Sequence, residues 1–211
     1  MKYSVVLVEN LCFYLETYGL KHMGILRTSG STATVNTFKN TFANKDGKEF
    51  RLKDDYNLDD VASFLKFCIR EYNGLFSQSA TQEILKLDPT SNRAGCITEM
   101  KRFVDSLPPD RKSTLHCFLG LLVKVKKNAS TNLMDSNAIG ISVGPTVFLC
   151  PLTEQAMSNQ MKLNTITTLM IDDYSKFFAG PSSMINKTPN PIKFPLLMIS
   201  FLTFMAMLFA A

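Results

Sequence analysis

The stretch from Leu58 to Tyr72 reads LDDVASFLKFCIREY and predicts a helix. Its apolar residues recur at intervals of three and four, which places them on one helix face. They are Val61, Phe64, Leu65, Cys68 and Ile69. Asp59 and Asp60 fall in the first turn, where the helix dipole favours anions, and Asn73-Gly74 follows as a stop signal. The stretch therefore predicts a helix with one buried face.

Similar periodicity continues on both sides of this helix. Further helices are expected over residues 4–18, 78–87, 96–106, 110–126 and 162–178, and in a segment through Val35, Phe38 and Phe42. Another should begin at residue 136 and end at Pro145. Residues 21–32 and 44–57 contain glycine or many polar side chains and predict loops. Because no set of alternating strands occurs, the sequence predicts an all-α helical bundle over residues 1–180.

The composition limits the classes of function. The chain has 211 residues and a net charge of +5, without a block of like charges, so charge gives no argument for nucleic-acid binding. Five separated cysteines and two histidines lack metal-ligand spacing, so we expect no metal site. The odd cysteine count indicates reduced thiols and a cytoplasmic domain. His116 and Cys117 suggest a base and a nucleophile, but neighbours on a helix point apart, so we expect both to be structural.

The last 18 residues, 194–211, form an apolar tail. Fifteen of them are apolar and none is charged. A helix of this length spans about 27 Å, close to the thickness of one bilayer core. Residues 181–193 are rich in proline and predict a linker. Because Lys187 and Lys193 precede the tail and no signal peptide begins the chain, residues 194–211 are a candidate membrane anchor that leaves the domain on the cytosolic face. A tail that never inserts is the alternative.

Five short segments, taken in their order along the chain, indicate a protein family. Residues 24–31 read GILRTSGS and residues 61–71 read VASFLKFCIRE. After them come LP at 107–108 with Leu115, NLM at 132–134 followed by VGPT at 143–146, and LMIDDY at 169–174 followed by Phe177 and Phe178. Together these segments resemble the motifs of RhoGAP domains, the activators of Rho-family GTPases, over about residues 5–178. The resemblance implies a RhoGAP-type bundle in signal transduction, whose partner is a Rho-, Rac- or Cdc42-type small GTPase in the GTP state.

The resemblance identifies Arg27 as an arginine finger. GTP hydrolysis develops negative charge on phosphoryl oxygens, which an always protonated, planar guanidinium supplied in trans can stabilise. Such an arginine must lie on an exposed loop that is held from behind, and Arg27 lies between two glycines after the first predicted helix. The protein would then be a regulator acting on its partner's active site rather than an enzyme. It would need no cofactor of its own, because the GTPase carries GTP and Mg²⁺.

Lys66 and Arg70 lie four residues apart on one side of the predicted helix. At these positions, members of the family brace the finger loop and contact the GTPase. We expect Arg70 to hold carbonyl groups of the loop and Lys66 to face the partner.

Three positions depart from the family pattern. Leu26 replaces a phenylalanine, which is a tolerable change in a core. Residues 72–75 read YNGL and lack the usual proline corner. The family asparagine that contacts the GTPase should lie six residues before Gly144, where this chain has Ala138. Asn137 is one residue early, and a helical step turns a side chain by about 100°, so only a bulge would bring Asn137 into register.

These departures leave two alternatives to an activator. The first is a catalytically weak or inactive module that binds the GTP-loaded GTPase as an effector or scaffold. The second is a helical interaction domain unrelated to GTPases. Faster consumption of GTP separates the activator from the first alternative, and binding to an active Rho protein separates it from the second.

Overall fold

The computed structural model describes residues 3–45, 56–71, 74–150 and 154–178. All elements in these ranges are helices, and the described residues contain no strand, which confirms the all-α prediction. In chain order they are α1 (Val5–Tyr14), the π-helical turn η1 (Leu15–Gly19), α2 (Thr32–Phe42), α3 (Leu58–Arg70), α4 (Gln78–Ile84), α5 (Arg93–Asp105), α6 (Pro109–Lys126), α7 (Ala129–Asn132), α8 (Ser136–Val147), α9 (Ala156–Asp172) and α10 (Tyr174–Phe177).

Several predicted helix boundaries are wrong. Helix α9 begins at Ala156 rather than at residue 162, and α4 ends at Ile84 rather than at residue 87. The first helix is predicted to run to residue 18, whereas the α-helix ends at Tyr14 and η1 follows it. Pro145 is predicted to end a helix, whereas α8 continues to Val147. A proline removes one hydrogen bond from a helix, but Pro145 lies in the last turn. There the N–H of Phe148 still donates to the carbonyl of Gly144, at 3.0 Å.

Short polar side chains fix where six of the described helices begin. Each accepts a hydrogen bond from a backbone N–H of the first turn; they are Ser4, Ser31, Asn57, Ser77, Asn92 and Asp135. Asn57 accepts from both Asp59 and Asp60, at 2.9 and 3.2 Å. A cap of this kind stabilises a helix by about 1 kcal/mol. These local contacts explain why the helices could be located from the sequence.

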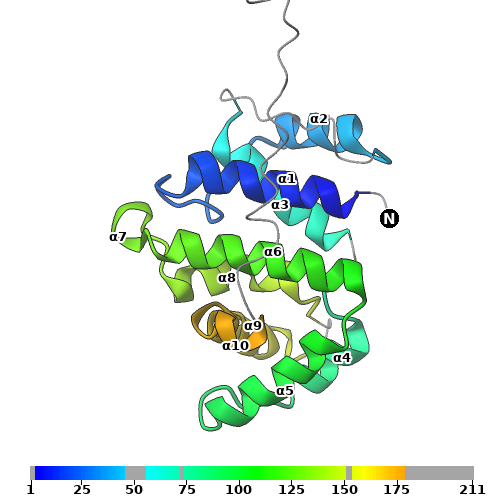
Figure 1. Cartoon of the computed structure of the whole chain (residues 1–211), viewed down its shortest axis with the longest axis vertical. Coiled ribbons are helices and arrows are strands. Elements are labelled where there is room, and N and C mark those ends of the chain that lie inside the picture. Colours follow the sequence, from blue (N-terminus) through cyan, green and yellow to red (C-terminus); the bar gives the residue numbers. More distant parts are fainter. Residues whose placement is uncertain (1–2, 46–55, 72–73, 151–153, 179–211) are drawn as a thin grey trace, which may run out of the picture. The chain divides into compact units, whose positions relative to one another are not determined.

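The central helix of the core is α6. It contacts α1, α8 and α9, and Figure 1 shows it running between α1 and the other two. Its buried side chains point to more than one side, which is typical of a helix inside a bundle; they include Leu115, Phe118, Leu119, Leu121 and Leu122. Helix α3 packs on α1, α2 and α8. This packing fixes α3 next to the loop that connects η1 with α2.

Helices α8 and α9 form the most tightly packed pair. Gly140 and Gly144 on α8 face Asn164 and Thr168 on α9. A Cβ atom at Gly140 would collide with Thr168 and Asn164, and one at Gly144 would collide with Asn164, so the close approach of the helices requires glycine. Thr168 Oγ1 also donates to the carbonyl of Ser136, at 3.2 Å. The hairpin therefore holds the start of α8, where Asn137 and Ala138 lie, in a fixed position.

The chain divides into two units, Met1–Ala179 and Gly180–Ala211. The predicted linker, 181–193, and the predicted membrane anchor, 194–211, lie outside the described residues. Within the described ranges, no helix is both long enough and apolar enough to cross a bilayer.

Candidate functional site

Arg27 lies on the loop between η1 and α2, and its side chain is exposed. The two residues before it, Ile25 and Leu26, are buried. Among the described residues, the Arg27 guanidinium has no hydrogen-bond or ion-pair partner. The loop therefore presents a free guanidinium next to a backbone that is anchored in the core.

The backbone of this loop makes a tight turn around Gly24. The carbonyl of Gly24 accepts hydrogen bonds from the N–H groups of Arg27 and Thr28, both at 2.9 Å. Gly24 has a φ of +73°, and a Cβ there would lie 2.8 Å from Thr28 Oγ1, so the turn requires glycine. Leu26 also has a positive φ, of 69°. For a leucine this costs about 1–2 kcal/mol, so other contacts must hold Leu26 in place.

Lys66 supplies one of these contacts. Its ammonium donates a hydrogen bond of 2.5 Å to the carbonyl of Leu26, the residue before the predicted finger. Burial lowers the pKa of Lys66, nearby Arg70 lowers it further, and Asp59 opposes both effects. The bond is therefore a charge-assisted one in a partly desolvated place, where it is stronger than an exposed pair.

The prediction that Arg70, rather than Lys66, holds a carbonyl of the finger loop is wrong. Lys66, expected to face the partner, holds the loop carbonyl instead. Arg70 makes no hydrogen bond to the loop within the described residues, and its side chain is exposed at the last turn of α3. The physical reason is reach: Lys66 lies one turn closer to the start of α3, where the loop crosses the helix. Both residues share the predicted helix face.

Three more side chains of α3 hold the loop, and the sequence reasoning missed their contacts. Asp60 is buried and accepts from the N–H of Ser31 at 2.5 Å. Ser63 accepts from the N–H of Gly30 at 2.9 Å. Asp59 pairs with His22, with 3.1 Å between Oδ1 and Nε2. Their spacing could have predicted these contacts, because Asp59, Ser63 and Lys66 follow one another at intervals of four and three residues and so share one face of the helix.

The one-residue bulge that would bring Asn137 into register does not occur. Helix α8 is a regular α-helix over its whole length. It begins at Ser136 and is capped by Asp135, whose side chain accepts from the N–H of Ala138 at 2.7 Å. Asn137 is exposed, but its side chain points about 100° away from that of Ala138. The corner at residues 72–73 lies outside the described residues.

Large apolar side chains are exposed beside the loop. The N–H of Gly24 donates to the carbonyl of Asn132 at 2.8 Å, and the neighbours of these two residues in the sequence are Met23 and Leu133. Met23 is 65% exposed and Leu133 is 55% exposed. A contiguous exposed apolar patch is typical of a protein-binding surface, and these two side chains are candidates for such a patch beside Arg27. The loop thus combines a free arginine with apolar neighbours.

The other candidates from the sequence do not form a site. The ring of His116 stacks on Phe178, with 4.4 Å between ring centroids, and burial lowers the pKa of His116. Cys117 is buried. Across the described ranges, no group of three histidine, cysteine, aspartate or glutamate side chains could hold a metal ion. The His116-Cys117 pair is therefore part of the packing.

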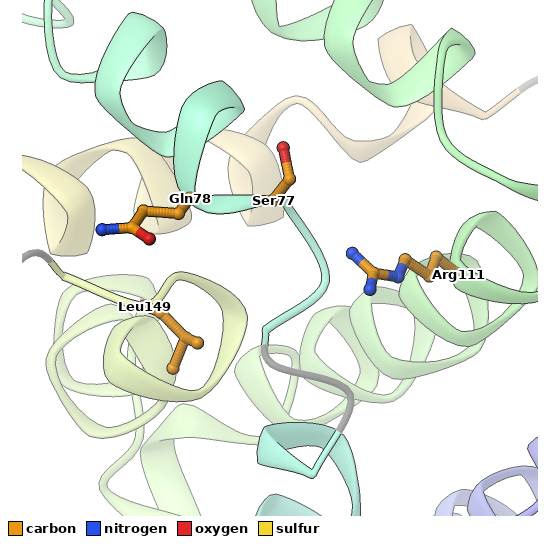
Figure 2. A pocket seen from close by; sticks show the side chains of 4 residues that line it. All are labelled: Ser77, Gln78, Arg111 and Leu149. Atoms are coloured by element: carbon orange, nitrogen blue, oxygen red, sulfur yellow. The ribbon is translucent and has the colours of Figure 1, made fainter. Parts of the chain in front are cut away.

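A hollow of about 400 Å³ lies elsewhere on the domain. It is lined by Ser77, Gln78, Arg111 and Leu149, and Figure 2 shows Arg111 of α6 facing the chain that enters α4. None of the predicted site residues lines it. The candidate site residues thus lie apart from this hollow.

The sequence and the fold were compared with those of known proteins. The family model of the RhoGAP domain matches residues 6–152. The chain belongs to the RhoGAP domain family. The structure is similar to human Rho GTPase activating protein 15, with a TM-score of 0.74 at 28% identity over 82% of each chain. It is also similar to the BH domain from GRAF, with a TM-score of 0.75 over 84% of this chain and 96% of the other, where 22% identity supports the fold alone.

Curated relatives extend far beyond this RhoGAP domain. SLIT-ROBO Rho GTPase-activating protein 2 of Danio rerio is 24% identical over 180 residues, which cover 85% of this chain and 16% of the relative. Unconventional myosin-IXa of Rattus norvegicus is 28% identical over 179 residues, which cover 82% of this chain and 7% of the relative. The chain thus spans less than a fifth of the length of these relatives.

Proposed function

We propose that this RhoGAP domain accelerates GTP hydrolysis by a Rho-family small GTPase, and that Arg27 is the finger it supplies in trans. The observation that carries the proposal is the guanidinium of Arg27, which is exposed and has no partner among the described residues, on a backbone that Lys66 holds at the adjacent Leu26 carbonyl. Family membership supports the class of partner.

The chemistry explains why a fixed backbone matters. The developing charge on the phosphoryl oxygens is stabilised best by a donor that needs little reorganisation when the reaction occurs. In activator-stimulated Ras, the acceleration is about 10⁵-fold, which corresponds to about 7 kcal/mol of barrier at 1.36 kcal/mol per factor of ten. A surface ion pair contributes only about 0–1 kcal/mol. Arg27 must therefore enter a water-excluded interface, and a rigid loop lets it do so without a large ordering cost.

Each of the other site residues takes a role that follows from its contacts. Lys66 supports the finger through the Leu26 carbonyl. Arg70 is exposed, and without a hydrogen bond or ion pair to the described residues it is free to contact the acidic or phosphate-bearing face of the partner. Asn137 stays a predicted contact from the first turn of α8. Met23 and Leu133 supply apolar area around the finger.

A second function, a docking module without acceleration, is favoured by one observation. Ala138 presents only a methyl group where the family has an asparagine, and the regular geometry of α8 does not move Asn137 into that place. If the missing amide is needed to order the partner's catalytic groups, the domain binds the GTP form but does not speed hydrolysis.

One pair of measurements separates the two functions. The full 211-residue chain is added to GTP-loaded Rho-, Rac- and Cdc42-type GTPases, and both binding and single-turnover hydrolysis are followed. An activator binds and accelerates hydrolysis on at least one of them. A docking module binds without acceleration, and failure to bind any of the three in the GTP state contradicts both functions.

We also propose that the domain acts on the cytosolic face of a membrane, anchored through residues 194–211. The support is the uncharged apolar sequence of the tail and the lysines before it. Anchoring would concentrate the domain near membrane-attached GTPases.

A further inference from the structure

Asn132 lies at the end of α7 and is completely buried. Its side-chain amide makes three hydrogen bonds of 2.8 Å. The Nδ2 group donates to the carbonyls of Leu20 and Val125, and Oδ1 accepts from the N–H of Met134. Both N–H groups of the amide are thus used, together with its oxygen.

The main chain of the same residue makes a fourth contact. The carbonyl of Asn132 accepts from the N–H of Gly24 at 2.8 Å. Asn132 therefore holds the segment from Leu20 to Gly24 at both ends, through its side chain at one end and its backbone at the other. Because Val125 belongs to the last turn of α6, this residue links the segment to the central helix of the core.

The Gly24 contact is connected directly to the finger. The carbonyl of Gly24 accepts from the N–H groups of Arg27 and Thr28, so a shift of Gly24 moves the turn that carries Arg27. Lys66 fixes the loop at the carbonyl of Leu26. The finger loop is thus anchored from two sides, by side chains of α3 and by the chain after α6.

We infer that Asn132 is a positioning residue for Arg27. This inference rests on the proposed function only for its effect on hydrolysis, since the anchoring itself is a property of the isolated domain. An asparagine is required because its two N–H donors face two carbonyls and its oxygen faces an N–H. An aspartate has the same shape but would place a carboxylate oxygen against two carbonyl oxygens. An alanine would remove the hydrogen bonds to the carbonyl of Leu20 and the N–H of Met134, and would leave the carbonyl of Val125 only its bond from the N–H of Asn128.

The test uses the full chain with Asn132→Asp, and Thr167→Val as a matched control. Thr167 Oγ1 is also buried and also bonds a backbone carbonyl, that of Leu163 at 2.9 Å, but within α9. Two readouts are followed: hydrogen exchange of the Gly24, Arg27 and Thr28 amides, and single-turnover GTP hydrolysis at saturating domain with the affinity for the GTP-loaded GTPase measured in parallel.

The inference predicts that Asn132→Asp speeds exchange at these amides and lowers the saturated rate by about tenfold or more, while the affinity changes by less than about threefold. Thr167→Val should leave both exchange and rate near wild type. Unchanged exchange and rate in Asn132→Asp overturn the inference, and so does an equal loss in the control. A merely structural role would lower stability without separating rate from affinity.

The exchange readout keeps the test independent of the proposed function. If wild type accelerates no GTPase, the proposed function fails, but faster exchange at Gly24 in Asn132→Asp still supports the anchor. If Asn132→Asp does not fold, hydrogen exchange in the wild-type chain tests the inference instead. The Gly24 amide must then exchange at least about tenfold more slowly than that of Met23, whose N–H has no partner in the described part of the chain. Equal exchange at the two amides overturns the inference.

Discussion

Replacing Lys66 by methionine should slow the stimulated hydrolysis of GTP without unfolding the domain. Methionine keeps the apolar stem of the side chain but loses the 2.5 Å hydrogen bond to the Leu26 carbonyl. A hydrogen bond to a charged group contributes about 1.5–3 kcal/mol. If the whole of this free energy is lost from the transition state, the rate falls by about tenfold to 150-fold, at 1.36 kcal/mol per factor of ten.

The backbone of the loop explains why this loss should reach the reaction. Leu26 has a φ of 69°, a conformation that costs a non-glycine residue about 1–2 kcal/mol. Without Lys66, the loop can relax towards negative φ and carry Arg27 away from its position. The affinity for the GTPase should change less than the rate, because the wider surface around the loop stays intact.

The assay is single-turnover hydrolysis by a Rho-family GTPase at saturating concentrations of the full chain. Lys101→Met serves as the matched control, since it makes the same chemical change in an exposed ion pair with Asp105 on α5. The control should keep the wild-type rate. If Lys66→Met stays folded and hydrolysis remains within about twofold of wild type, the reasoning about the anchored loop is refuted.

Three further outcomes are expected. Burial against Phe178 lowers the pKa of His116 in the folded chain from its usual value of 6.5. Between the folded and the unfolded pKa the unfolded chain binds more protons, so the stability of wild type should fall as the pH drops below about 6.5. His116→Phe should remove this pH dependence in thermal unfolding. A fall in stability that is the same in both proteins would contradict this. Gly140→Ala should lower the unfolding midpoint, because the new Cβ meets Thr168, and an unchanged midpoint would show that α8 and α9 can separate freely. A soluble reporter fused to residues 181–211 should sediment with membranes and resist alkaline extraction, whereas a reporter that stays in the supernatant would exclude the anchor.

The helices could be predicted because their signals are local. Apolar spacing located α3 and α6, and side-chain caps such as Asn57 fix where helices begin. The misplaced boundaries show the limits of apolar spacing. Pro145 lies in the last turn of α8, where the N–H of Phe148 still donates to the carbonyl of Gly144, and the change from α1 to the π-helical turn at Leu15 was not predicted from the spacing.

Part of the site followed from the sequence and part did not. The sequence placed Arg27 on an exposed loop and set Lys66 and Arg70 on one helix face. It could not show which of them reaches Leu26, because that depends on where the loop crosses α3. The amide of Asn132 bonds Leu20, a partner 112 residues away. No local pattern reveals a contact over such a separation.

The most direct test of the account compares two arginines. Arg27→Ala and Arg102→Ala are made in the full chain; Arg102 is an exposed arginine on α5 that pairs with Glu99 at 3.0 Å. Single-turnover hydrolysis is followed on GTP-loaded Rho-, Rac- and Cdc42-type GTPases. The account predicts that wild type and Arg102→Ala accelerate hydrolysis alike, while Arg27→Ala still binds the GTP form but loses about 10³- to 10⁵-fold of the acceleration. Equal acceleration by Arg27→Ala and wild type would contradict the assignment of Arg27 as the finger.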